Sequence, residues 1–267
     1  MQQLLAIEWL KIRRYRTFKI LIGFFIAMLP LWNLGMYKSM IGIGGAKKGS
    51  GVNLLNTIYS FPGVWGNMTF WGSIFIMFMS VLVIILVTNE YSFRTNRQNV
   101  IDGWTRMQFY HAKVWLVVML SLFATVYVLI VSWLFGLVIS GNMSDMFTDI
   151  EKIAWFFLLS LNYMGFAMFI AIWIRRSGLA IGLFFLYSLM IEKMVQGVIN
   201  YFSDINFGNF LPLQASDELV PFPALESLSK AVSKSPAIPV AAYIGVTIFW
   251  CLVYYFGAKA ILQKRDW

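Results

Sequence analysis

Apolar residues in this chain occur in long uninterrupted blocks, and polar residues gather in the segments between them. Each block is long enough to cross a bilayer core of about 30 Å, which takes about 20 helical residues. Pro30 falls inside the first block, where we expect a kink because proline removes a backbone hydrogen bond. The pattern predicts six membrane-spanning helices, at about 18–37, 64–87, 114–140, 153–174, 179–199 and 237–258.

Composition supports the same class of protein. Of the 267 residues, 60% are hydrophobic and only 12% are charged, whereas a soluble domain carries about 25% charged residues. No polar segment is long enough for an independent core, so we predict one all-α, polytopic transmembrane domain over residues 1–267. The single cysteine, Cys251, excludes an intramolecular disulfide. The basic lead-in lacks a small-residue cleavage site, so we expect the first block to be retained.

The distribution of basic residues predicts the orientation. The net charge is +9, and with the N-terminus inside, 14 of the 21 Lys and Arg residues fall in inside segments. Cytoplasmic segments collect Lys and Arg, so we predict that both termini are cytoplasmic. Residues 38–62 and 200–236 then form extracytoplasmic loops. Residues 1–17 suit an interfacial elbow helix, although their amphipathic pattern is modest.

The polar segment 88–113 connects the second and third blocks on the predicted cytoplasmic side. Its pattern predicts a short helix over 93–102 that stops at Gly103, because glycine tolerates the left-handed conformation found just past helix ends. Thr105 and Gln108 have the spacing of a capping box, in which each side chain covers a free backbone N–H. A second helix is therefore expected to run from this box into the third block.

The residues of this predicted elbow allow two interpretations. The elbow is either a docking element for a cytoplasmic partner or an ordinary connection whose arginines lie near anionic lipid headgroups. The chain has no soluble domain of its own, so the energy for any active transport must come from another chain or from an ion gradient. The charged residues available for docking are Arg94, Arg97, Asp102 and Arg106.

Several short motifs carry a resemblance to a known family. The elbow contains Glu90-Tyr91, Arg94-Thr95, Ile101-Asp102-Gly103-Trp104-Thr105-Arg106 and Lys113. Together these resemble the cytoplasmic loop of ABC-2 type transporter permeases, although Arg94 replaces the glycine that the family usually has there. The run Arg-Arg-Ser-Gly-Leu-Ala-Ile-Gly at 175–182 is similar to the turn between the family's fourth and fifth helices, and the basic lead-in to its elbow helix. The resemblance covers the whole chain.

The resemblance implies a fold and a function. The fold would have six spans, an interfacial elbow helix, and a coupling helix between the second and third spans. The chain would be the non-enzymatic permease subunit of an ATP-driven exporter in a bacterial inner membrane, without a cofactor, a metal or a nucleic-acid partner of its own. ATP and Mg would bind two copies of a separate ATPase subunit, and a second permease, identical or homologous, would complete the assembly. The implied coupling contacts are Glu90, Arg94, Thr95, Arg97, Asp102 and Gly103.

Glu192 and Lys193 are acid–base neighbours inside an apolar block. Ionised groups are costly in lipid, so such residues usually line an interior or a pathway. In the alternative interpretation, the fifth block ends near Met190 and the two residues form a charged pair at the outer headgroup level. A buried acid also suits the alternative function, an ion-coupled secondary transporter or channel, although we detect no internal repeat. The sole histidine, His111, excludes a two-histidine metalloprotease site.

Overall fold

The computed structural model describes residues 15–44, 58–93, 95, 103, 105–140, 145–203, 206–223 and 238–264. Within these residues, all regular secondary structure is helical. Six of the helices are long and apolar enough to cross a membrane. The predicted all-α, polytopic class is therefore confirmed.

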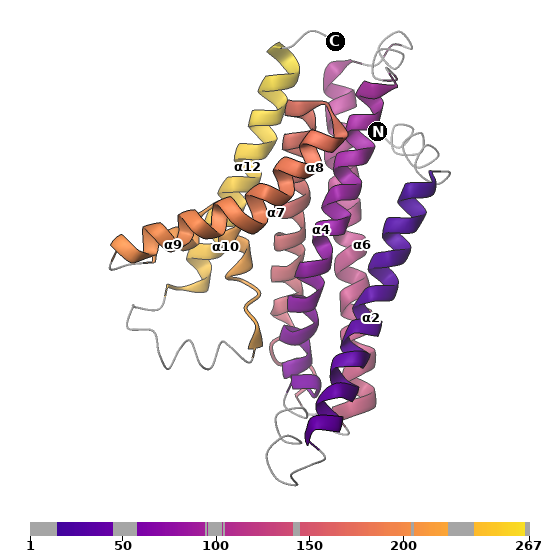
Figure 1. Cartoon of the computed structure of the whole chain (residues 1–267), viewed down its shortest axis with the longest axis vertical. Helices are drawn as coiled ribbons and strands as arrows, with labels where there is room; N and C mark the ends of the chain where they lie inside the picture. The colour runs from indigo at the N-terminus through magenta and orange to yellow at the C-terminus, as the bar shows by residue number, and fades with distance from the viewer. Residues whose placement is uncertain are drawn as a thin grey trace.

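The long helices form an up-and-down bundle, from which the fifth departs obliquely (Figure 1). The first four are α2 (Arg16–Gly44), α4 (Gly63–Ser92), α6 (Arg106–Ser140) and α7 (Glu151–Ile174). The fifth consists of α8 (Ser177–Leu186), the π-helical turn η1 (Tyr187–Ile191) and α9 (Glu192–Phe202), and the sixth is α12 (Val240–Lys264). The short elements η2 (Phe207–Phe210) and α10 (Gln214–Asp217) lie between α9 and α12 in the chain.

One end of the bundle carries the start of α2, the end of α12 and the junction between α4 and α6 (Figure 1). We call it the terminal end. Here the helices extend beyond the predicted blocks, since α4 continues to Ser92 and α6 begins at Arg106. Hydropathy placed these limits at 87 and 114 because the last turns carry polar residues. Pro30 lies inside α2, and the helix continues on both sides of it.

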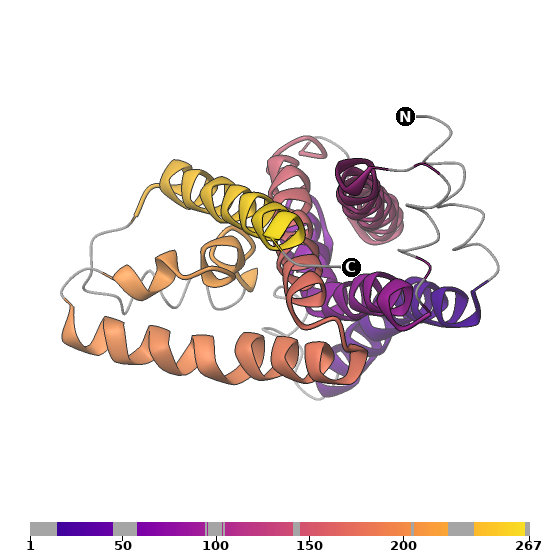
Figure 2. The same ribbon diagram turned by 90° about the horizontal axis from the view of Figure 1, so that it is seen from above.

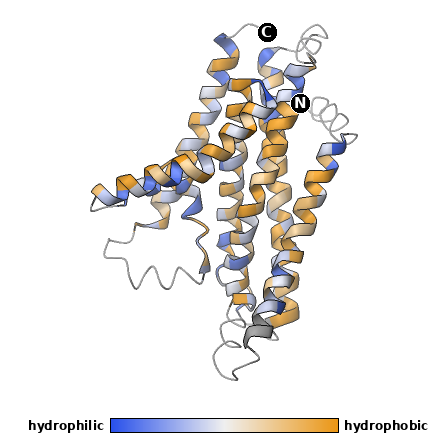
Figure 3. Ribbon diagram, viewed as in Figure 1, coloured by the Kyte–Doolittle hydropathy of each residue, from blue (hydrophilic) through white to orange (hydrophobic). Residues whose placement is uncertain are grey.

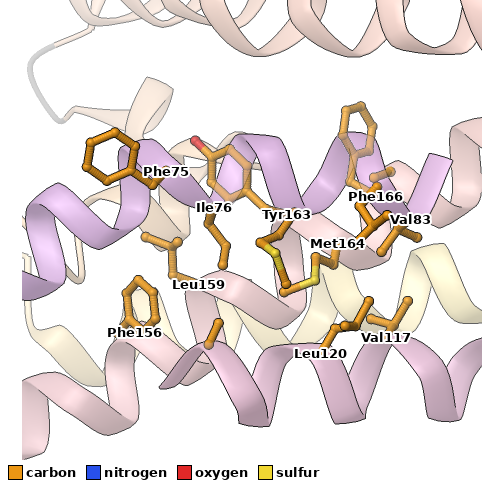
Figure 4. Close-up of a cluster of buried hydrophobic side chains, with 14 of the residues drawn as sticks. Phe75, Ile76, Val83, Val117, Leu120, Phe156, Leu159, Tyr163, Met164 and Phe166 are labelled. Atoms are coloured by element: carbon orange, nitrogen blue, oxygen red, sulfur yellow. The ribbon is translucent and has the colours of Figure 1, made fainter. Parts of the chain in front are cut away.

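The buried core lies between α4, α6 and α7. Figure 4 shows side chains from these three helices meeting in one cluster. Gly72 allows the close approach, because a Cβ at this position would lie 2.9 Å from Cε2 of Phe156 and 3.2 Å from Cγ2 of Val128. The outer faces of the helices are also apolar, with exposed Leu, Ile, Val and Phe side chains. Such all-round apolarity is typical of helices whose outer solvent is lipid.

Part of the predicted loop 200–236 is folded and lies beside the fifth spanning helix. α8 starts at the terminal end, and α9 points away from the bundle at about half its height (Figure 1). Seen from above, η2 and α10 lie between α9 and α12 (Figure 2), and α10 contacts both α7 and α12. α9 carries hydrophilic positions among its hydrophobic ones (Figure 3). Residues 206–220 thus pack against the bundle.

Candidate functional site

An ion pair joins α4 and α6 at the terminal end. Lys113 Nζ lies 2.7 Å from Oε1 of Glu90, and the two side chains are 1% and 11% exposed. Lys113 also lies over the Phe109 ring, 5.3 Å from its centroid. Since both partners are nearly inaccessible, the charges neutralise each other within the protein. The pair therefore ties the two helices that lead into and out of segment 88–113.

Further contacts attach this junction to the other helices. His111 adds a contact of 3.2 Å between its Nε2 and the Tyr255 hydroxyl. The junction is thus held from several sides. Four other contacts join α4 or α6 to a neighbour: Asn89 Nδ2 to the Tyr15 hydroxyl (2.6 Å), the Tyr110 hydroxyl to the Tyr255 carbonyl (2.7 Å), Arg106 Nη1 to the Gln263 carbonyl (3.4 Å), and the Arg175 guanidinium over the Tyr91 ring (4.9 Å).

Local geometry confirms the predicted capping box and is consistent with the predicted stop before it. Gly103 has a φ of +95°, the left-handed conformation expected just past a helix end. The Thr105 N–H donates to Oε1 of Gln108 at 2.8 Å, and the Gln108 N–H donates to Oγ1 of Thr105 at 3.2 Å. α6 then runs without interruption through Lys113, as predicted.

The predicted coupling residues occupy different environments. The Glu90 carboxylate faces Lys113 inside the protein, so contact with a partner would require this ion pair to open. The Thr95 hydroxyl donates to the Glu90 carbonyl at 3.4 Å, and Gly103 is exposed. The remaining predictions fall outside the described residues: Arg94, Arg97, Asp102 and the rest of the short helix over 93–102.

A second polar cluster surrounds Glu192, which is only 2% exposed. Its Oε1 accepts hydrogen bonds from the N–H groups of Leu213 at 2.6 Å and Gln214 at 3.0 Å. These N–H groups open the short helix α10, and the first N–H groups of a helix have no partner within it. A carboxylate also interacts favourably with the positive end of a helix. Glu192 therefore fixes the start of α10 against α9.

Lys193 connects the first and last residues of α10. Its Nζ donates to Oδ2 of Asp217 at 2.9 Å and to Oε1 of Gln214. The second carboxylate oxygen of Asp217 accepts a hydrogen bond of 2.7 Å from the Tyr163 hydroxyl. Glu192 and Lys193, adjacent in sequence, therefore both bind this short helix instead of each other: Glu192 binds the backbone at its start, and Lys193 binds side chains at both of its ends.

The cluster lies beside the middle of α7. Tyr163 is 12 residues, or about 18 Å, from the start of this 24-residue helix. Its neighbour Asn162 donates to the Pro212 carbonyl at 2.8 Å and to Oγ of Ser216 at 2.9 Å. A helix of this length is about as long as the bilayer core is thick. The cluster therefore lies level with the centre of a spanning helix.

Two buried oxygens of this region have no hydrogen-bond partner among the described residues: Oε2 of Glu192 and the hydroxyl of Tyr254. Nearby, burial raises the pKa of the Glu218 carboxyl above its usual range, and a hydrogen bond from Gln214 opposes that rise. In the part of the chain that the structure describes, no three His, Cys, Asp or Glu side chains are grouped to hold a metal.

Sequence reasoning singled out Glu192 and Lys193 but missed the other polar residues of the cluster. Asn162, Tyr163 and Asp217 lie 24 to 54 positions away from the groups they bind. A weak signal was present, because Asn162 interrupts the apolar block 153–174. An amide placed in such a block needs hydrogen-bond partners from another segment.

Comparison with known proteins adds no family assignment. No protein-family model matches the chain, and no curated protein matches it significantly. Function therefore rests on the residues and their geometry.

Proposed function

We propose that this protein is the membrane-spanning permease subunit of an ATP-driven exporter and that a separate ATPase supplies the energy. The observation that carries the proposal is the junction at the terminal end. Segment 88–113, whose residues resemble a coupling loop, begins and ends on helices joined by the buried Glu90–Lys113 ion pair. A partner that moved this segment would therefore move α4 and α6 together.

In the proposed mechanism, displacement of the coupling segment moves α4 and α6 at this junction. ATP and Mg bind the partner ATPase, and closure of its dimer displaces the coupling segment. Contacts from the junction to α2, α12 and the turn before α8 pass the displacement to the rest of the bundle. Packed interfaces transmit such shifts because they switch between discrete arrangements. Two permease chains, identical or homologous, enclose the substrate pathway.

Co-purification tests the proposal. The tagged chain is expressed with candidate ATPase subunits from its own cell, and the retained ATPase is quantified. We expect retention by the unaltered chain and loss in the charge reversals Arg97→Glu and Asp102→Lys. Lys152→Glu is the matched control, because Lys152 belongs to an ion pair at the start of α7, and α7 starts at the opposite end of the bundle (Figure 1). Full ATP-independent transport by the chain alone would contradict the proposal.

One observation favours the second candidate, an ion-coupled secondary transporter or channel. The Glu192 carboxylate is buried within a spanning helix and keeps one oxygen without a partner among the described residues. Buried acids in such positions serve as ion or proton sites in carriers. Substrate flux into sealed vesicles separates the candidates. Flux driven by an ion gradient without ATP, and abolished by Glu192→Gln, would favour the carrier.

A further inference from the structure

A cavity of about 200 Å³ lies beside the Lys193–Asp217 ion pair, between α4, α7, α9 and the segment that follows α10. One part of its lining is charged and polar, and the other part is apolar. The ion pair and the Tyr163 side chain supply charged and polar groups. The apolar part of the lining comes from Phe70, Ile74 and Met77 of α4 and from Val220 and Pro221.

The ion pair keeps hydrogen-bonding capacity for a ligand. An ammonium group has three N–H donors, and Lys193 gives two of them to Asp217 and Gln214. A carboxylate has about four acceptor positions, and Asp217 uses one for Tyr163 and one for Lys193. The Lys193 and Asp217 side chains are 47% and 24% exposed. One donor and two acceptor positions are therefore available next to the cavity.

The depth of the pair indicates what kind of ligand fits. Asp217 binds Tyr163 at the middle of α7, so the two partly exposed charges lie level with the apolar layer of a bilayer. Charges exposed to hydrocarbon are costly, and a polar occupant removes that cost. The apolar remainder of the lining suits a hydrocarbon chain. An amphiphile matches both parts of the cavity, whereas a small hydrophilic solute matches only one.

We propose that this cavity binds a zwitterionic phospholipid, with its phosphate at Lys193, its ammonium at Asp217 and an acyl chain along Phe70, Ile74 and Met77. A purely anionic headgroup at Lys193 would meet the Asp217 carboxylate, which lies only 2.9 Å from Nζ. A headgroup of paired opposite charges matches the pair without repulsion. The site lies within this chain, so the proposal does not depend on an ATPase partner.

Thermal unfolding of the purified chain in neutral detergent tests the proposal. Four additives are compared: phosphatidylethanolamine, phosphatidylglycerol and diacylglycerol with identical acyl chains, and soluble phosphoethanolamine. A ligand in large excess over its Kd should raise the midpoint by about 5 °C. We expect that shift from phosphatidylethanolamine and a clearly smaller one from the others. An equal shift from diacylglycerol or from phosphoethanolamine, or a larger one from phosphatidylglycerol, would overturn the proposal.

Substitutions test whether the shift of the unfolding midpoint comes from lipid bound in this cavity. Lys193→Met and Asp217→Asn should abolish the preference for phosphatidylethanolamine, whereas Lys152→Met should keep it. Lys152 is the matched control because it also forms a partly exposed ion pair at 2.9 Å, with Asp149. Met77→Trp narrows the cavity without touching the charges and should also remove the shift, so the test survives if a charge variant fails to fold. An unchanged shift in Met77→Trp would place the lipid elsewhere and refute the site.

Discussion

Glu90 and Glu192 are both buried glutamates on spanning helices, but the protein satisfies them in different ways. Glu90 faces a full positive charge, the Lys113 ammonium at 2.7 Å. Glu192 faces two backbone N–H groups at the start of α10, at 2.6 and 3.0 Å. One carboxylate pairs with another side chain, and the other pairs with the backbone of a short segment.

The difference indicates that the two glutamates stabilise structures of different size. The Glu90 ion pair joins two long helices, α4 and α6, and links them to each other at the terminal end. Glu192 organises a segment of only a few residues, whose short helix would be marginal alone. We infer that the terminal end transmits motion as a unit, whereas residues 206–220 open locally.

Lys113→Met should have the largest effect, because it removes the ammonium from the buried Glu90–Lys113 ion pair. Breaking one side of a buried pair costs about 3–5 kcal/mol, whereas replacing both sides by apolar residues is often nearly neutral. The double variant Glu90→Met with Lys113→Met should therefore recover most of the free energy of unfolding. Denaturant unfolding in detergent measures the free energy of unfolding of the unaltered protein, the single variant and the double variant. A double variant as unstable as Lys113→Met would contradict the ion-pair interpretation.

Glu192→Leu should destabilise residues 206–220 by about 2–3 kcal/mol, because two buried N–H groups lose their acceptor. Glu192→Gln keeps an acceptor oxygen and should cost less. Hydrogen exchange of backbone amides is the appropriate measurement, since it resolves local opening. Faster exchange is expected over 206–220 and not at the junction between Ser92 and Arg106. Equal acceleration at both places would show that the regions unfold together.

Asp217→Asn should have a smaller effect, about 0.5–1.5 kcal/mol, because the asparagine oxygen can still accept a hydrogen bond from Lys193. The hydroxyl of Tyr163 can still donate to the asparagine oxygen. The expected result is a modest increase in hydrogen exchange over 206–220. Asp149→Asn serves as the comparison, because its ion pair with Lys152 has similar geometry. A loss as large as that of Glu192→Leu would mean that this pair, and not Glu192, holds α10.

The smallest expected effect is the dependence of stability on pH. Burial raises the pKa of Glu218 in the folded protein above the ordinary value of 4.5. The folded state therefore binds this proton more readily than the unfolded state, and stability falls as pH rises from about 4.5 through the raised pKa. Glu218→Gln should remove this dependence from hydrogen exchange over 206–220. A pH dependence that persists in the variant would assign the titration to another group.

Sequence reasoning succeeded where the physics is local. Block lengths predicted the six spanning helices, because crossing a bilayer demands a fixed number of apolar residues. The box at Thr105 and Gln108 was predicted from a three-residue spacing, since both hydrogen bonds form within one turn. Segment 206–220 was predicted as part of a loop, because its few helical residues carry no periodic pattern of their own.

The sequence by itself determined that this is a helical membrane protein, where its spans lie, and which end carries a capped junction. Only the tertiary structure decided that Glu192 and Lys193 both bind α10, and that Glu90 is paired with Lys113. The physical reason is the range of the interactions. Helix length and capping depend on neighbours within a few residues, whereas these side chains meet partners 21 to 24 positions away in the chain. Only the packing of the helices brings such groups together.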